Sequence, residues 1–284
     1  LRQDDEGGNT AFGEVCPTPG FTRFTLEQAQ AEADHWVRYG GEADDFRFIG
    51  SALGCIGSGI WKEPREKSVL PPIARMHQAE DGQESATIKR KIGTQSINEE
   101  IPIVLDWLSR LSAKQRVRLD ANESLSRKQL MRWVKALHEE KRIEFIEQPT
   151  SRPDDEWLLR FAVESPVPLA LDESISRMGG VKKLLFLEGS LFYVIKPSLF
   201  SDWTSILSLI EKKPDRVVLS TVYESPFGYE ALIRLACRSM VSAGLERSFF
   251  RDNTYEFPEH HSFPLLSPSV TNLQIKQLWD VLQK

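Results

Sequence analysis

Five short apolar runs between residues 86 and 196 each end on a charged residue, and this repetition constrains the fold more than any other feature of the sequence. The runs are ATIKRK, VRLD, IEFIE, LALD and FYVIK. Because side chains alternate between the two faces of a strand, Lys89 and Lys91 point to the same face. The last four runs end at intervals of 27, 25 and 24 residues, on Asp120, Glu147, Asp172 and Lys196. This spacing suits one strand and one helix per step.

The alternation of strands and helices indicates a parallel sheet with helices outside it. We expect strands at 70–76, 86–92, 117–120, 143–147, 167–172, 191–196 and 216–220, with a last one near 245–250. Helices are expected at 97–111, 126–140, 154–164, 180–187, 201–212 and 229–240. About eight strands favour closure into a barrel, and about 250 residues is the usual size of a single α/β barrel.

The first part of the chain predicts a smaller unit. A turn over residues 5–9 joins two short strands, and Thr25 with Gln28 forms a capping box for a helix that ends at Tyr39. Residues 46–61 contain four glycines and predict a close-packed helix or helix pair. Because the chain begins in mid-strand, we expect residues to be missing before Leu1.

Composition excludes several classes of partner. A net charge of −5 provides no basic field for nucleic acid. Cys16, Cys55 and Cys237 lie far apart and form no CxxC pair, so neither a disulfide framework nor a zinc site is indicated. No apolar run reaches the length of about 18 residues that spans a bilayer, and no signal peptide is evident. We expect a cytoplasmic protein with no membrane partner.

The charged strand ends predict a metal site at the mouth of the barrel, where functional residues of such folds gather. Buried charges are costly unless they are paired or bind a metal, so several of them in one mouth indicate a site. Asp120, Glu147 and Asp172 offer three oxygen ligands, which suit Mg²⁺ better than zinc. Each carboxylate taken alone could instead cap the following helix or pair with a lysine.

Lysines on either side of this metal site could act as bases. A lysine becomes a base near neutral pH when neighbouring positive charge and partial desolvation lower its pKa. Lys91 has Lys89 two residues away, and Lys196 is expected across the mouth. Enolase-superfamily enzymes combine such a base with Mg²⁺ to remove a proton next to a carboxylate.

Six motifs resemble the o-succinylbenzoate synthases, a family in the muconate-lactonising subgroup of the enolase superfamily. The motifs are TIKRKIG, RLDAN, FIEQP, ALDES, VIKPSLF and STVYESPFG. The resemblance implies a modified TIM barrel of the (β/α)7β type with a smaller α+β capping domain. It also implies Mg²⁺-dependent dehydration of 2-succinyl-6-hydroxy-2,4-cyclohexadiene-1-carboxylate to 2-succinylbenzoate, through a metal-stabilised enediolate. This is a carbon–oxygen lyase reaction of menaquinone and phylloquinone biosynthesis, and Mn²⁺ is expected to substitute for Mg²⁺.

The resemblance also implies roles for individual residues. Lys91 matches the base and Lys196 the lysine opposite, which steadies the enolate in synthases and is the second base in racemases. Asp120, Glu147 and Asp172 match the Mg²⁺ ligands. The expected substrate-binding residues are Lys89, Ser220, Thr221, Glu224 and Ser225. Asn122 and Arg118 are expected to support the site, although an Asx-turn at Asn122 and a purely structural Arg118 remain open.

Three domains follow from this resemblance: a capping domain at 1–68 lacking its first strand and loop, a barrel at 69–250, and a C-terminal segment at 251–284 that packs back on the capping domain. An N-succinylamino-acid racemase or a dipeptide epimerase needs the same metal and lysines and remains an alternative. A non-catalytic barrel with a metal centre is a further alternative. The sequence does not indicate an oligomeric state.

Overall fold

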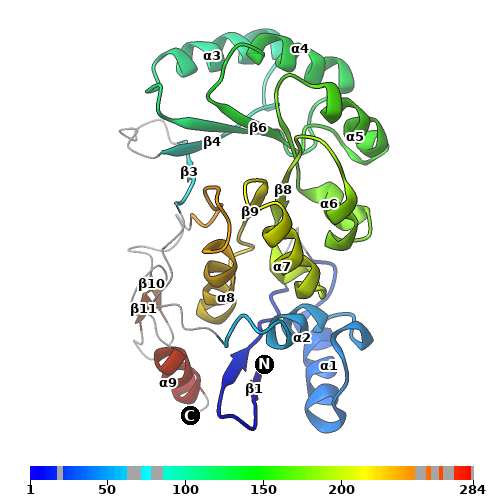
Figure 1. The fold of residues 1–284 in the computed structure, drawn as a ribbon, viewed down its shortest axis with the longest axis vertical. Helices are drawn as coiled ribbons and strands as arrows, with labels where there is room; N and C mark the ends of the chain where they lie inside the picture. The colour runs from blue at the N-terminus through cyan, green and yellow to red at the C-terminus, as the bar shows by residue number, and fades with distance from the viewer. Residues whose placement is uncertain are drawn as a thin grey trace.

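The computed structural model describes residues 1–17, 22–62, 72–77, 86–246, 254–256, 262–264 and 272–282. Its main feature is a curled sheet of seven strands that follow one another in chain order (Figure 1). They are β3 (Arg75–Met76), β4 (Thr87–Lys91), β5 (Arg116–Asp120), β6 (Ile143–Glu147), β7 (Leu169–Leu171), β8 (Phe192–Ile195) and β9 (Val217–Leu219). All neighbouring pairs are parallel. The predicted parallel α/β fold is therefore confirmed.

A short segment lies between the first and the last strand of this sheet. Ala243 forms a parallel bridge with Ile73, next to β3, and Gly244 forms one with Ser220, next to β9. Through these bridges the segment joins the two edges of the sheet. Closure of the sheet was expected from the number of predicted strands. The sequence placed the closing strand near 245–250, whereas this pairing lies just before that range. Most of the predicted strand falls outside the described residues.

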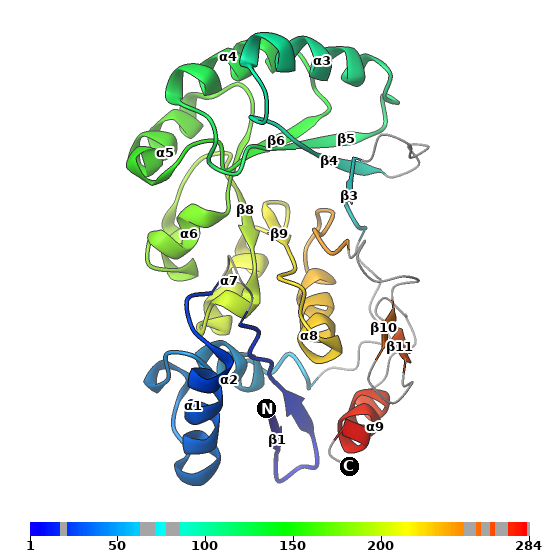
Figure 2. The same cartoon turned by 180° about the vertical axis from the view of Figure 1, so that it is seen from behind.

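Helices cover the outer face of the sheet, as both views show (Figures 1 and 2). They are α3 (Ile97–Ser109), α4 (Arg127–Leu137), α5 (Asp155–Glu164), α7 (Trp203–Lys212) and α8 (Pro226–Ala236). In α4 the buried side chains recur at helical spacing, at Leu130, Trp133, Val134 and Leu137. No helix within the described ranges is long and apolar enough to cross a membrane.

The helix predicted at 180–187 is wrong in type. That stretch is a 3₁₀ helix, η4 (Val181–Phe186), and a short helix α6 (Glu173–Arg177) precedes it. Gly179 and Gly180 have φ angles of 88° and 92°. This left-handed backbone suits glycine and ends α6, so the chain turns before it can form a longer helix.

The first segment forms a hairpin followed by helices. It contains β1 (Arg2–Asp4), β2 (Thr10–Phe12), α1 (Leu26–Tyr39), the 3₁₀ turn η1 (Ala43–Asp45) and α2 (Gly50–Gly57). Both the hairpin and the capping box of Thr25 and Gln28 are confirmed. A Cβ atom on Gly54 would lie 1.8 Å from the carbonyl oxygen of Ser201, so α2 packs directly on the backbone that precedes α7.

Near the other end of the chain, helix α9 (Asn272–Leu282) contacts this first segment. The Trp279 ring lies 5.7 Å from the ring of Phe12, and Arg2 forms an ion pair of 3.0 Å with Asp280. Two short strands, β10 (Thr254–Glu256) and β11 (Ser262–Pro264), pair with each other before α9. Two further 3₁₀ turns, η3 (Arg152–Asp154) and η5 (Pro197–Leu199), follow β6 and β8. The domain boundaries at 68/69 and 250/251 are not tested by these contacts and remain predictions.

Candidate active site

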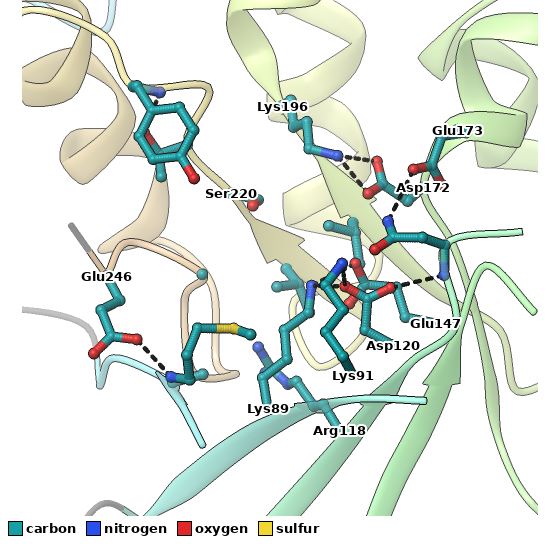
Figure 3. Close-up of a pocket in the computed structure, with 18 residues that line it drawn as sticks. Lys89, Lys91, Arg118, Asp120, Glu147, Asp172, Glu173, Lys196, Ser220 and Glu246 are labelled. Atoms are coloured by element: carbon teal, nitrogen blue, oxygen red, sulfur yellow. Dashed lines mark hydrogen bonds and ion pairs between the residues drawn. The ribbon is translucent and has the colours of Figure 1, made fainter. Parts of the chain in front are cut away.

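A pocket of about 520 Å³ opens at the carboxyl ends of the strands and contains most of the predicted site residues (Figure 3). Two sides of it differ in chemistry. The charged wall consists of Lys89, Lys91, Asp120, Glu147, Asp172 and Lys196. The loop wall consists of Ser220, Thr221, Tyr223, Gly244 and Glu246. The sequence prediction that the charged strand ends share one space is thus matched by the geometry.

The three carboxylates of the charged wall lie at the ends of successive strands. The parallel register places Asp120 beside Glu147, and Asp172 directly follows β7. Asp120 and Glu147 are each 2% exposed and Asp172 is 8% exposed. Buried carboxylates need positive partners or a metal, because desolvation disfavours their charged form.

Lysines neutralise these carboxylates. Lys89 Nζ lies 2.7 Å from Glu147 Oε1 and 2.8 Å from Asp120 Oδ2. Lys91 Nζ donates to the same Oδ2 atom at 3.0 Å, and Lys196 donates to both carboxylate oxygens of Asp172. Figure 3 shows Lys89 and Lys91 reaching this cluster from one side and Lys196 from another.

Burial and charge oppose each other in the pKa values of this wall. Burial raises the pKa of Glu147, and the charges of Asp120 and Asp172 add to that rise against the opposing effect of Lys89. Burial also raises the pKa of Asp172, although Lys196 opposes it. For Asp120 burial acts upward, but Lys89 and Lys91 outweigh it and lower the pKa.

The pKa of Lys89 is raised. Burial alone would lower it, but the charges of Glu147 and Asp120 outweigh that effect. Lys89 is therefore a cation held between two carboxylates, with its side chain 23% exposed. Lys91 is more accessible, with its side chain 47% exposed.

The residues of the charged wall fit Mg²⁺ by the chemistry of their donors. Within the described residues, no three His, Cys, Asp or Glu side chains already converge as a formed metal site. Oxygens of Asp120, Glu147 and Asp172 accept hydrogen bonds from lysines. These buried carboxylates on adjacent strands nevertheless supply hard oxygen ligands. A divalent cation would offset the burial that chiefly raises the pKa of Glu147 and the repulsion from Asp120 and Asp172 that adds to it.

The two predicted supporting residues lie at different depths. Asn122 lines the pocket, its backbone N–H donates to Asp120 Oδ1 at 3.1 Å, and its side chain donates to Glu173 at 3.3 Å. Arg118 is only 1% exposed and forms an ion pair of 2.7 Å with Glu144. Asn122 therefore contacts a candidate ligand directly, whereas Arg118 acts as a charge partner lower in the barrel.

The structure does not bring Glu224 to the pocket lining. Glu224 is fully buried, and its carboxylate accepts hydrogen bonds from Ser198 Oγ at 2.8 Å and from Thr221 Oγ1 at 2.6 Å. It also accepts from Val222 N at 3.1 Å. In this arrangement Glu224 holds the loops after β8 and β9 together.

Ser225 likewise faces away from the pocket, toward the first segment of the chain. Its backbone N–H donates to Glu14 Oε1 at 2.7 Å, and its hydroxyl donates to Glu14 Oε2. Gly228 N donates to the same carboxylate at 2.9 Å, so Glu14 caps the start of α8. Burial raises the pKa of Glu14 against these hydrogen bonds. Binding of substrate by Ser225 finds no support in this geometry.

Sequence reasoning missed several residues that the structure places in or behind the pocket. Glu173 and Glu246 line it, and Met76 N donates to Glu246. Glu173 directly follows a predicted ligand, which was a usable signal. Glu246 follows the closing segment, whose position the sequence did not reveal. Gln148, directly after Glu147, is fully buried and bonds to several backbone atoms.

Strained backbone gathers beside the pocket. In the described part of the chain, the non-glycine residues with positive φ are Asn122 (40°), Glu123 (65°), Gln148 (35°) and Tyr223 (70°). Gln148 directly follows β6, Asn122 and Glu123 lie two and three residues after β5, and Tyr223 lies in the loop after β9. Such conformations cost about 1–3 kcal/mol each and are typical of functional sites.

Comparison with known proteins shows the family and supports the fold. The sequence model of the family described as "Enolase C-terminal domain-like" matches residues 73–238. A curated o-succinylbenzoate synthase from Thermosynechococcus vestitus is 31% identical over 261 residues, covering 83% of this chain and 79% of that protein. One from Pasteurella multocida is 27% identical over 258 residues, covering 82% and 75%.

Solved structures agree. The o-succinylbenzoate synthase of Thermosynechococcus elongatus, complexed with magnesium in its active site, superposes with a TM-score of 0.69 at 26% identity, covering 99% of this chain and 90% of that chain. The muconate lactonizing enzyme of Pseudomonas putida gives a TM-score of 0.68 at 18% identity, covering 99% and 93%. The second likeness supports the fold alone.

Proposed function

The chain belongs to the enolase C-terminal domain-like family, and from this premise we propose that it is an o-succinylbenzoate synthase. The proposed reaction is dehydration of 2-succinyl-6-hydroxy-2,4-cyclohexadiene-1-carboxylate to 2-succinylbenzoate, as a step of menaquinone or phylloquinone biosynthesis in the cytoplasm. The observation that supports it most is the convergence of three carboxylates and three lysines in one pocket.

Proton removal is assigned to Lys91. Its side chain is the most exposed of the three pocket lysines, so its Nζ can meet a substrate that enters from the mouth. In the proposed reaction, the lone pair of Lys91 Nζ takes the proton next to the substrate carboxylate. The ring C–O bond then breaks, and the same proton passes from Lys91 to the departing hydroxyl group, which leaves as water and gives the aromatic product. Lys196 lies beside Asp172 and is proposed to steady the electron-rich ring by its positive charge.

The remaining groups of the charged wall would hold the metal and the substrate carboxylate. Asp120, Glu147 and Asp172 are the proposed ligands of Mg²⁺, for which Mn²⁺ could substitute. Bound Mg²⁺ would supply positive charge where negative charge develops on the substrate carboxylate. Lys89, already held between two of these carboxylates, adds positive charge on the same side.

The loop wall is proposed to accept the succinyl tail. Ser220 and Thr221 contribute hydroxyl groups to the pocket, and Tyr223 contributes an aromatic ring that is 44% exposed. The hydroxyl groups can hydrogen-bond to the succinyl tail, and they lie apart from the charged wall where the reaction is proposed to occur.

The test is a spectrophotometric assay of the cyclohexadiene absorbance, first with Mg²⁺ and then with excess EDTA. The proposal predicts rapid loss of absorbance that EDTA abolishes. Folded protein that binds Mg²⁺ without consuming this substrate would contradict it. The same protein should then be offered N-succinylamino acids and dipeptides, because Lys91 and Lys196 would also serve a racemase or epimerase.

A further inference from the structure

Gln148 connects two of the candidate ligands through its side chain. It directly follows Glu147, and its Oε1 atom accepts hydrogen bonds from Asp172 N at 2.9 Å and from Ser174 N at 3.1 Å. Its Nε2 atom donates to Ser174 Oγ at 2.6 Å and to Thr150 O at 3.1 Å. The side chain of one residue thus binds the backbone on which the next carboxylate is mounted.

The backbone of both residues is unusual, which explains why it needs such support. Gln148 has a φ of 35°, and Asp172 has φ and ψ of −130° and −85°. Neither conformation belongs to a regular helix or strand. The direction of the Asp172 carboxylate depends on these angles, so the bond from Asp172 N to Gln148 fixes where the carboxylate points.

Further polar contacts lead from Ser174 to the loop after β5. Ser174 Oγ donates to Asp155 Oδ1 at 2.6 Å, and Arg177 donates to Asp155 at 2.9 Å. Arg177 also forms an ion pair of 2.7 Å with Glu123, which lies three residues beyond the candidate ligand Asp120. The loops after β5, β6 and β7 are therefore joined by one continuous set of polar contacts, with Gln148 at its buried centre.

We propose that Gln148 is a positioning residue, whose amide sets the placement of Asp172 relative to Glu147 and thereby the affinity of the charged wall for Mg²⁺. This inference rests on the proposed function only for the identity of the metal. An amide suits the role because it accepts two backbone N–H groups and donates two hydrogen bonds at once. Residues that orient ligands without touching the metal commonly alter metal affinity by about 10–100-fold.

The experiment measures the affinity for Mg²⁺ alone, by titration calorimetry on the full chain, together with thermal unfolding of the metal-free protein. Gln148→Met removes the hydrogen bonds at nearly constant volume. Gln115→Met is the matched control. Gln115 is 5% exposed and its side chain accepts a hydrogen bond from Ser112 N at 2.9 Å, but it lies before the start of β5, at the end remote from Asp120. Ser174→Ala is a milder variant, since it keeps the bond between Asp172 N and Gln148.

We expect Gln148→Met to raise the Kd for Mg²⁺ by at least about tenfold and Ser174→Ala by about threefold, while Gln115→Met leaves it within about twofold. Both methionine variants should lower the unfolding temperature. Should Gln148→Met fail to fold, the Ser174→Ala titration decides. An unchanged Kd in a folded Gln148→Met or Ser174→Ala variant overturns the inference, as does an equal loss in Gln115→Met. Absence of Mg²⁺ binding by the wild-type protein instead removes the metal part of the proposed function, and this inference with it.

Discussion

The charged wall and the loop wall of the pocket are built in different ways. Five residues of the charged wall end a strand or directly follow one, and Lys89 lies two residues before the end of β4. Their charges are paired within the wall. In the loop wall, Ser220 and Thr221 follow β9, Gly244 belongs to the short closing segment, and Glu246 follows that segment. The difference suggests that the charged wall determines which reaction occurs, whereas the loop wall determines which substrate is accepted.

The strongest test of this contrast is Lys91→Ala. Loss of a general base should lower turnover by about 10³-fold, because such groups contribute about 10²–10⁴-fold. The Kd for Mg²⁺ should not rise, since Lys91 is not a proposed ligand and its removal takes a competing positive charge away from Asp120. Steady-state kinetics and calorimetry measure both, with Lys135→Ala on the surface of α4 as the control. Turnover above a tenth of the wild-type value would remove Lys91 as the base.

Glu147→Gln tests the metal assignment. The variant loses one buried negative charge and leaves Lys89 with a weaker partner, so the Kd for Mg²⁺ should rise by at least about 100-fold. Glu144→Gln is the matched control, because Glu144 lies on the same strand but pairs with Arg118 deeper in the barrel. Equal Mg²⁺ affinity in the wild type and Glu147→Gln would show that the metal lies elsewhere.

Metal removal should destabilise the protein through the charged wall alone. At a Mg²⁺ concentration about 100 times the Kd, binding stabilises the fold by about 2.7 kcal/mol, which corresponds to about 5–10 °C in unfolding temperature. Scanning calorimetry with Mg²⁺ and with EDTA measures this shift. Glu147→Gln should lose it, and Ser220→Ala should keep it. A shift in unfolding temperature as large in Glu147→Gln as in the wild type would contradict the assignment of Mg²⁺ to the charged wall.

The smallest effect is expected in the loop wall. Tyr223→Ala should raise KM by about tenfold, since a half-buried aromatic contact contributes about 1–2 kcal/mol. The turnover number and the Kd for Mg²⁺ should change little. Tyr39→Ala, an exposed tyrosine outside the pocket, is the control. A loss of turnover with unchanged KM would place Tyr223 in the reaction itself.

The two walls also differ in how far they could be predicted from sequence. Asp120, Glu147 and Lys196 each follow an apolar run, and in a parallel sheet the carboxyl ends of such runs meet at one edge. Local pattern therefore sufficed for the charged wall. Glu224 and Ser225 were predicted to face the substrate, but their partners are Ser198 and, more than two hundred residues away, Glu14. No local pattern reveals such distant partners.

The fold shows the same limit. Helix starts with a capping box, such as that of Thr25, were predictable because the interaction spans three residues. The closing contact of Ala243 and Gly244 was placed too late, because two bridging residues are too short to give a strand pattern. The role of Gln148 was missed since its contacts depend on backbone from the next strand.

The positive φ angles beside the pocket bear on how such a protein would respond to selection. Glycine adopts these angles without steric cost, so Tyr223, which lines the pocket, is a position where replacement by glycine would relieve strain. A laboratory population selected only for heat resistance would be expected to accumulate such replacements there. Its members would gain stability and lose a side chain at the mouth, so selection for activity must be applied in the same round.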